Sequence, residues 1–121
     1  MTLILSVYIP ILEYMNEFTP ALAERIAARF RVLGDPTRIR ILHAVQERER
    51  TVGGLAELLG VNQASMSKHL AILRDEGLLQ AERRGTQVIL TLKDASLMEL
   101  CTLVCAGVRR TAEERLTALN P

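Results

Sequence analysis

Residues 51–77, with the sequence TVGGLAELLGVNQASMSKHLAILRDEG, constrain the fold of this chain more than any other segment. Leucines in the first part recur at the three- and four-residue spacing of an amphipathic helix, namely Leu55, Leu58 and Leu59. Thr51 is a suitable N-cap, and Gly60 can adopt the positive φ that ends a helix and turns the chain sharply. The pattern predicts a short helix, a tight turn and a second, longer helix.

The second helix is expected to be apolar on one side and polar on the other. Asn62 can cap it, and its apolar side consists of Met66, Leu70 and Leu73. The other side carries groups that can reach base edges in a DNA major groove, namely Gln63, Ser65, Ser67, Lys68 and His69. Gln63 is the best candidate for direct base readout, with adenine as its partner. The alternative is a purely structural helix-turn-helix.

The next segment, residues 78–92, is typical of a β-hairpin. Apolar Val88, Leu90 and Leu92 alternate with Ile89 and Thr91, opposite the shorter segment Leu78–Glu82. Between the two runs, Arg83, Arg84 and Gly85 are predicted to form the turn. Such a hairpin makes a winged helix-turn-helix, in which the two arginines contact the DNA backbone or the minor groove. Alternatively, the arginines only prevent an edge strand from pairing with other chains.

With these motifs in order, the chain resembles the ArsR/SmtB-type winged-helix repressors of bacteria. The resemblance rests on FRVLGDPTRIRIL at 30–42, the block from Ser65 to Leu79, the wing RRGTQVILTL and a closing apolar helix, and it spans roughly residues 19–118. It implies a mainly α fold with a small β-hairpin wing, dimerising through terminal helices. It also implies a cytoplasmic homodimeric repressor that binds a palindromic operator on double-stranded DNA and leaves it when an effector binds.

Composition limits the other classes of function. The length of 121 residues suits one domain, and aromatic residues make up only 3%, too few for platforms that stack single-stranded bases. The net charge is only +1, so affinity for DNA has to come from local placement of basic groups. His43 and His69 have no evident acid or nucleophile partner, and we expect no enzymatic activity. A protein-interaction module without DNA binding is the alternative, although basic Lys68 beside polar groups argues against it.

The first 18 residues, 1–18, form an apolar N-terminal extension of uncertain role. They lack the basic region and cleavage site of a signal peptide. The apolar run is also too short to span a membrane and is interrupted by Pro10 and Glu13, so we expect no membrane association. Three interpretations stay open: a segment that widens a dimer contact, a cover for the core, or upstream read-through with Met15 as the start.

Two helices are predicted between this extension and the helix-turn-helix. The first begins at Thr19-Pro20, ends at Gly34 and has an apolar face of Leu22, Ile26, Phe30 and Leu33. The second begins at Asp35-Pro36 and runs to about Glu47, with inward side chains Ile39, Leu42 and Val45. Thr37 and Arg38 near its start can bind a DNA phosphate. Arg40 is either a third such contact or a surface ion-pair partner.

The last helix predicts the oligomeric state. Asp94 can cap it, and the run from Leu97 to Val108 is apolar on more than one side, with Glu99 as its only charge. A surface helix needs a single apolar stripe, so the spare face should pack on a partner in a twofold dimer. The expected interface residues are Leu97, Leu100, Cys101, Val104, Cys105 and Val108.

No effector site is complete in the sequence. Metal-sensing members of the family use a Cys-x-Cys pair where this chain has Thr51-Val52-Gly53, or a last-helix site of which only Asp94 remains. The cysteines present, Cys101 and Cys105, are four apart on a helix, where Cβ atoms lie about 5–6 Å apart, which is too far for a disulfide. Across a twofold axis they are weak candidates for a soft metal, arsenite, an interchain disulfide or another thiol modification. Plain packing is the alternative.

Overall fold

The computed structural model describes residues 17–119, and the chain divides into two compact units between Asp35 and Pro36. Most of the proposed extension 1–18 therefore lies outside the described residues. The division falls inside the segment 19–118 that was expected to be one domain, and the limits of that domain stay a prediction.

The first unit contains α2 (Pro20–Leu33). As predicted, Thr19 caps it: the hydroxyl oxygen of Thr19 accepts a hydrogen bond from the backbone N–H of Leu22 at 3.1 Å, and Gly34 ends the helix. No residue of α2 is buried, and Ile26 and Phe30 on its apolar face are both exposed. The helix thus keeps an apolar face available for packing.

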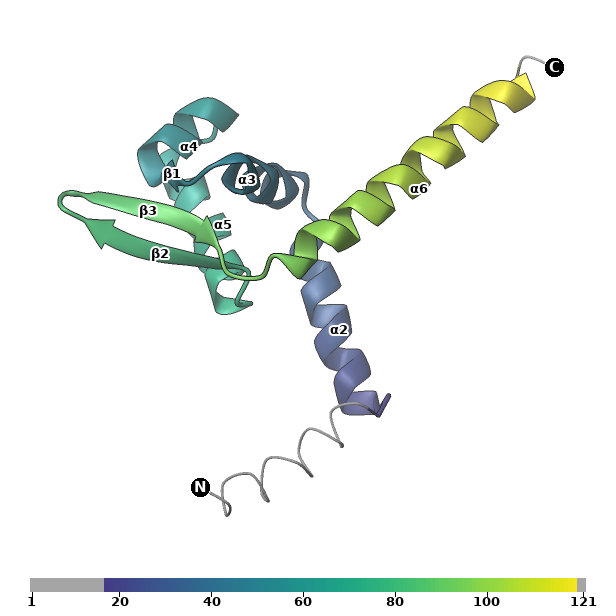
Figure 1. The fold of residues 1–121 in the computed structure, drawn as a ribbon, viewed down its shortest axis with the longest axis horizontal. Coiled ribbons are helices and arrows are strands. Elements are labelled where there is room, and N and C mark those ends of the chain that lie inside the picture. Colours follow the sequence, from purple (N-terminus) through teal and green to yellow (C-terminus); the bar gives the residue numbers. More distant parts are fainter. Residues whose placement is uncertain (1–16, 120–121) are drawn as a thin grey trace. The chain divides into compact units, whose positions relative to one another are not determined.

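The second unit is mostly helical, with a small three-stranded antiparallel sheet in the order β1-β3-β2 (Figure 1). This confirms the predicted fold class. Its elements in chain order are α3 (Pro36–Glu47), β1 (Arg50–Thr51), α4 (Val52–Leu59), α5 (Gln63–Asp75), β2 (Leu79–Arg84), β3 (Gln87–Leu92) and α6 (Ser96–Leu119). Strand β1 was not predicted, because two residues after a charged loop show no periodicity.

The helix-turn-helix forms through the predicted caps. The Thr51 hydroxyl oxygen accepts a hydrogen bond from the N–H of Gly54 at 3.0 Å, and α4 ends at Gly60 in the left-handed conformation with φ of 65°. Asn62 Oδ1 then accepts a hydrogen bond from the N–H of Ser65 at 2.8 Å and starts α5. Local chemistry alone therefore accounts for the turn between the two helices.

An aliphatic core lies between α3, α4, α5 and the sheet. Its fully buried large side chains are Ile41, Leu42, Leu55, Met66, Leu73, Leu78, Leu79 and Leu90. One inward assignment was wrong, because Ile39 is 47% exposed. Leu58, which belongs to the predicted apolar stripe of the first helix, is 54% exposed. On α3 the side that faces the core is instead centred on Ile41, Leu42 and Val45, so Ile39 falls outside it.

The wing is a β2–β3 hairpin that is longer than expected. Arg84 pairs with Gln87, so Arg83 and Arg84 belong to β2 and the turn consists of Gly85 and Thr86. The predicted turn of Arg83, Arg84 and Gly85 was therefore wrong in its bounds. The turn is shorter because Gly85 has a φ of 64°, which suits a two-residue hairpin turn. Strand β3 lies between two strands, and consecutive Ile89 and Leu90 are both buried.

Helix α6 begins in the core and leaves it. Asp94 lies two residues before the start of the helix, and its carboxylate accepts a hydrogen bond from the N–H of Ser96 at 3.1 Å. Leu97 and Met98 are buried, whereas almost every residue from Thr102 onwards is exposed. Among the described residues, no helix is long and apolar enough to cross a membrane.

Candidate nucleic-acid interface

The first turns of α5 present the polar groups expected to read DNA. Gln63, Ser67 and Lys68 are exposed, while Ser65 and His69 are half-buried. The buried stripe of Met66, Leu70 and Leu73 fixes this orientation, as predicted. Gln63 is the first helical residue after the Asn62 cap, where unpaired backbone N–H groups and the helix dipole favour an anion such as phosphate.

A side-chain contact joins α5 to the start of α3. Arg38 Nη1 lies 3.3 Å from His69 Nδ1, and both residues are half-buried. Because a guanidinium only donates, the contact is a hydrogen bond when Nδ1 of His69 is unprotonated. The fold thus brings together two residues from motifs that are 31 positions apart, and half-buried Thr37 precedes Arg38 in the same helical turn.

The two wing arginines differ in their surroundings. Successive side chains of a strand point to opposite faces, so Arg83 projects from one face of β2 and Arg84 from the other, beside Glu82. Arg84 Nη1 donates to Glu49 Oε1 at 2.8 Å, and Nη2 donates to Glu82 Oε2 at 3.1 Å. These hydrogen bonds, first to Glu49 and then to Glu82, raise the pKa of Arg84 above its ordinary value.

Two further arginines make hydrogen bonds to other parts of the same chain. Arg40 Nη2 donates to the backbone oxygen of Leu59 at 3.2 Å, at the end of α4 where a helix dipole favours a cation. This contact is neither the phosphate contact nor the ion pair considered from the sequence. Arg50 donates to the backbone oxygen of Ala44 at 3.0 Å and to Glu47 at 3.1 Å. The contact between Arg40 and Leu59 had no local signal, because the two residues are 19 positions apart and meet only in the folded chain.

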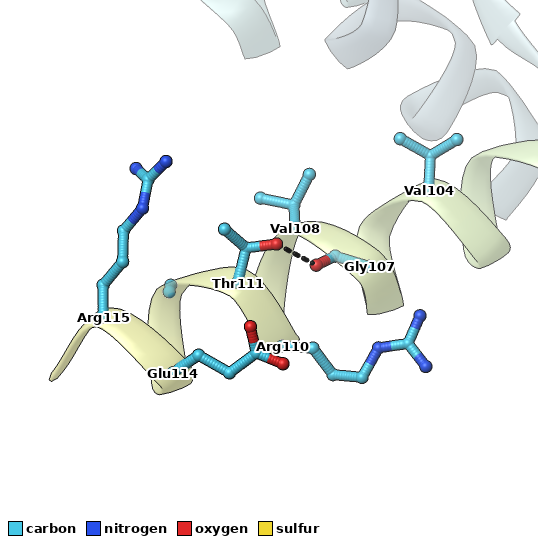
Figure 2. A pocket seen from close by; sticks show the side chains of 8 residues that line it. Val104, Gly107, Val108, Arg110, Thr111, Glu114 and Arg115 are labelled. Carbon is cyan, nitrogen blue, oxygen red and sulfur yellow. Dashed lines mark hydrogen bonds between the residues drawn. The ribbon is translucent and has the colours of Figure 1, made fainter. Parts of the chain in front are cut away.

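The expected dimer surface occupies the exposed part of α6. Val104 is 54% exposed and Val108 is 63% exposed, and both project from the same side of the helix (Figure 2). Arg110 and Glu114 leave the helix in other directions, so a shallow groove runs along its flank. Leu97 differs from the other expected residues because it is buried within its own chain.

The remaining expected interface residues differ in how exposed their side chains are. Leu100 and Cys101 are half-buried and Cys105 is exposed, and both cysteines are free thiols. Within residues 17–119, no group of three or more His, Cys, Asp or Glu side chains is arranged to hold a metal ion. The two thiols of one chain therefore do not complete a coordination set within the described part.

Comparison with known proteins identifies the family. The sequence profile described as "Bacterial regulatory protein, arsR family" matches residues 35–81, from α3 through the middle of β2. The HTH-type transcriptional regulator Rv0081 of Mycobacterium tuberculosis is 32% identical over 92 residues, which cover 75% of this chain and 81% of that protein. The chain belongs to the ArsR family. The resemblance found in the sequence is thereby confirmed.

Solved structures of relatives share the winged fold. The crystal structure of Rv0081 has a TM-score of 0.73 at 29% identity, covering 82% of this chain and 99% of that one. The solution structure of the homodimeric winged helix-turn-helix DNA-binding domain of Mb0332 from Mycobacterium bovis has a TM-score of 0.71. It is 26% identical and covers 83% of this chain and 95% of that one.

A further curated relative is a repressor of a resistance operon. The probable mercury resistance operon repressor of Streptomyces lividans is 35% identical over 74 residues, covering 61% of this chain and 59% of that protein. The ArsR family is a family of transcriptional regulators.

Proposed function

We propose that this chain is a homodimeric transcriptional repressor that binds a palindromic operator in double-stranded DNA. The observation that carries this function is the exposed polar start of α5, with Gln63, Ser67 and Lys68 on a helix whose other side is anchored in the core. A helix presented in this way fits the major groove, where Gln63 can bond an adenine edge and Lys68 a phosphate.

Residues around this helix complete the proposed contact surface. Thr37 and Arg38 at the start of α3 bind backbone phosphates in this proposal. It is supported by the contact of the Arg38 guanidinium with His69 at 3.3 Å, which holds Arg38 beside α5. Half-buried Ser65 and His69 lie on the flank of α5 and border the readout surface formed by Gln63, Ser67 and Lys68. Arg83 and Arg84 extend the surface onto the wing.

Dimerisation follows from the exposed apolar flank of α6. Its solvent-exposed large side chains include Val104, Val108, Leu116 and Leu119. Packing this flank against the same flank of a twofold-related copy buries both flanks. It also sets the two α5 helices at a fixed separation, which a protein needs in order to bind both halves of a palindromic site. The partly exposed Cys101 and Cys105 belong to this surface, where a soft metal or thiol modification in the dimer would act on helix packing. A regulator that reaches the bacterial chromosome works in the cytoplasm.

The experiment that tests this function is replacement of Gln63 by alanine. We expect Gln63→Ala to weaken binding to the cognate operator by about 1–3 kcal/mol, because one direct base contact is lost. Binding to a scrambled duplex should not change, since phosphate contacts are kept. The measurement is a titration of labelled upstream DNA and scrambled DNA by fluorescence anisotropy.

A matched control is Gln46→Ala, which removes an exposed glutamine from the far end of α3. We expect this variant to bind both duplexes like the unaltered protein. An unaltered preference for the operator in Gln63→Ala would show that α5 does not read bases through Gln63.

A further inference from the structure

An arginine on the wing is held between two carboxylates that the sequence places far apart. Glu49 lies in the segment between α3 and β1, and its Oε1 accepts a hydrogen bond from Arg84 Nη1 at 2.8 Å. Glu82 Oε2 accepts a second one from Nη2 at 3.1 Å. The side chains of Arg84, Glu49 and Glu82 are about half-exposed or more, so the cluster meets solvent.

Strand pairing builds this cluster. Glu82 and Arg84 are two apart on β2 and therefore share a face. Strand β1 pairs with β3 through Arg50↔Leu90, which brings the preceding residue, Glu49, beside the wing. Arg83 lies on the opposite face of β2 and is not part of the cluster.

The charges of the cluster oppose contact with DNA. One guanidinium is matched by two carboxylates, so the group is net negative although it contains a wing arginine. A phosphate can bind Arg84 by displacing a carboxylate or through the N–H groups of the guanidinium that remain. In either case at least one carboxylate stays close to a DNA backbone with one charge per about 1.7 Å, and the two repel each other. Exposed ion pairs are weak and are screened by salt, so the exchange is possible but unfavourable for DNA.

We propose that Glu49 acts as an acidic latch that occupies Arg84 and lowers the affinity of the wing for DNA phosphates. The latch rests on the proposed DNA-binding function and adds a regulatory element to it. Glu49 is the stronger competitor because its contact is the shorter one and because it comes from outside the hairpin. In this arrangement Arg83 is the wing arginine ready for DNA, and Arg84 contributes less because its two carboxylates repel a phosphate.

The test is Glu49→Gln, which removes the charge and keeps the size of the side chain. We expect tighter binding to any duplex, by about two- to fivefold per wing at 0.1 M salt, which is the range of exposed ion pairs. A dimer engaging both wings should show the square of that factor. The plot of log K against log salt should steepen by about one unit per freed phosphate contact. Both quantities come from anisotropy titrations at several salt concentrations.

Glu47→Gln is the matched control. It makes the same change of charge two residues away, but the Glu47 carboxylate pairs with Arg50 at 3.1 Å and not with Arg84. A second test combines Glu49→Gln with Arg84→Gln, where the gain should disappear because the latched cation is gone. Glu82→Gln, which leaves the shorter Glu49 contact in place, should give a smaller gain than Glu49→Gln.

Three results would overturn the latch. The first is that Glu49→Gln and Glu47→Gln bind DNA with equal affinity. The second is that the gain in DNA affinity persists when Arg84 is also replaced. The third is that Glu49→Gln binds DNA more weakly than the unaltered protein, which would mean that Glu49 supports the wing. Operator preference tests the underlying function separately. A protein that binds operator and scrambled duplex alike, yet gains affinity through Arg84 on loss of Glu49, would keep the latch and refute the operator function.

Discussion

A glutamate on the exposed flank of α6 tests the dimer most directly. In a single chain Val108 is 63% exposed, so Val108→Glu should leave the fold of the monomer intact, within about 0.5 kcal/mol. In the dimer proposed here the same position packs against the partner. The substitution should therefore separate the subunits without unfolding them.

The magnitude follows from the exposed fraction. Full burial of a valine contributes about 2 kcal/mol, so the 63% that is available for a partner corresponds to about 1 kcal/mol. Burying a carboxylate without a partner adds at least about 2 kcal/mol. The loss is then about 3 kcal/mol per subunit and about 6 kcal/mol per twofold dimer, which weakens dimerisation about 10⁴-fold.

Sedimentation velocity across a concentration series measures this effect, with far-UV circular dichroism as the check on folding. The matched control is Ala106→Glu, which introduces the same residue at an exposed position of α6. Ala106 is two residues from both Val104 and Val108, so it does not share their face. A Val108→Glu protein that sediments as a dimer, or a control that dissociates equally, would refute the assignment of this flank as the interface.

Two further predictions concern the turn and the thiols. Asn62→Ala removes the acceptor for the Ser65 N–H at 2.8 Å and should cost about 1 kcal/mol of unfolding free energy, measured by urea denaturation; no change would mean that water replaces the cap. Cys101→Ser with Cys105→Ser should bind operator DNA and respond to zinc, arsenite and mild oxidant as the unaltered protein does, because residues 17–119 of one chain offer no third metal ligand beside the two thiols. Release of only the unaltered protein in a gel shift would show that the thiols sense an effector.

Much of the recognition unit could be predicted from the sequence because its determinants are local. Thr51, Gly60 and Asn62 set the helix ends through hydrogen bonds and a positive φ within a few residues. The spacing of Met66 and Leu73 on one helix face then decided which side of α5 is buried. The polar side that is proposed to meet DNA follows from the same periodicity.

The tertiary structure decided the contacts between charged groups. Glu49 belongs to a charged loop whose sequence gives no sign that it reaches Arg84, which lies 35 positions further along the chain. Only the pairing of β1 with β3 brings the two together. Likewise, only the packing of α3 beside α4 brings Arg40 to the carbonyl of Leu59. Periodicity indicates which face of an element is apolar, whereas the partner of a long polar side chain depends on which elements lie beside it.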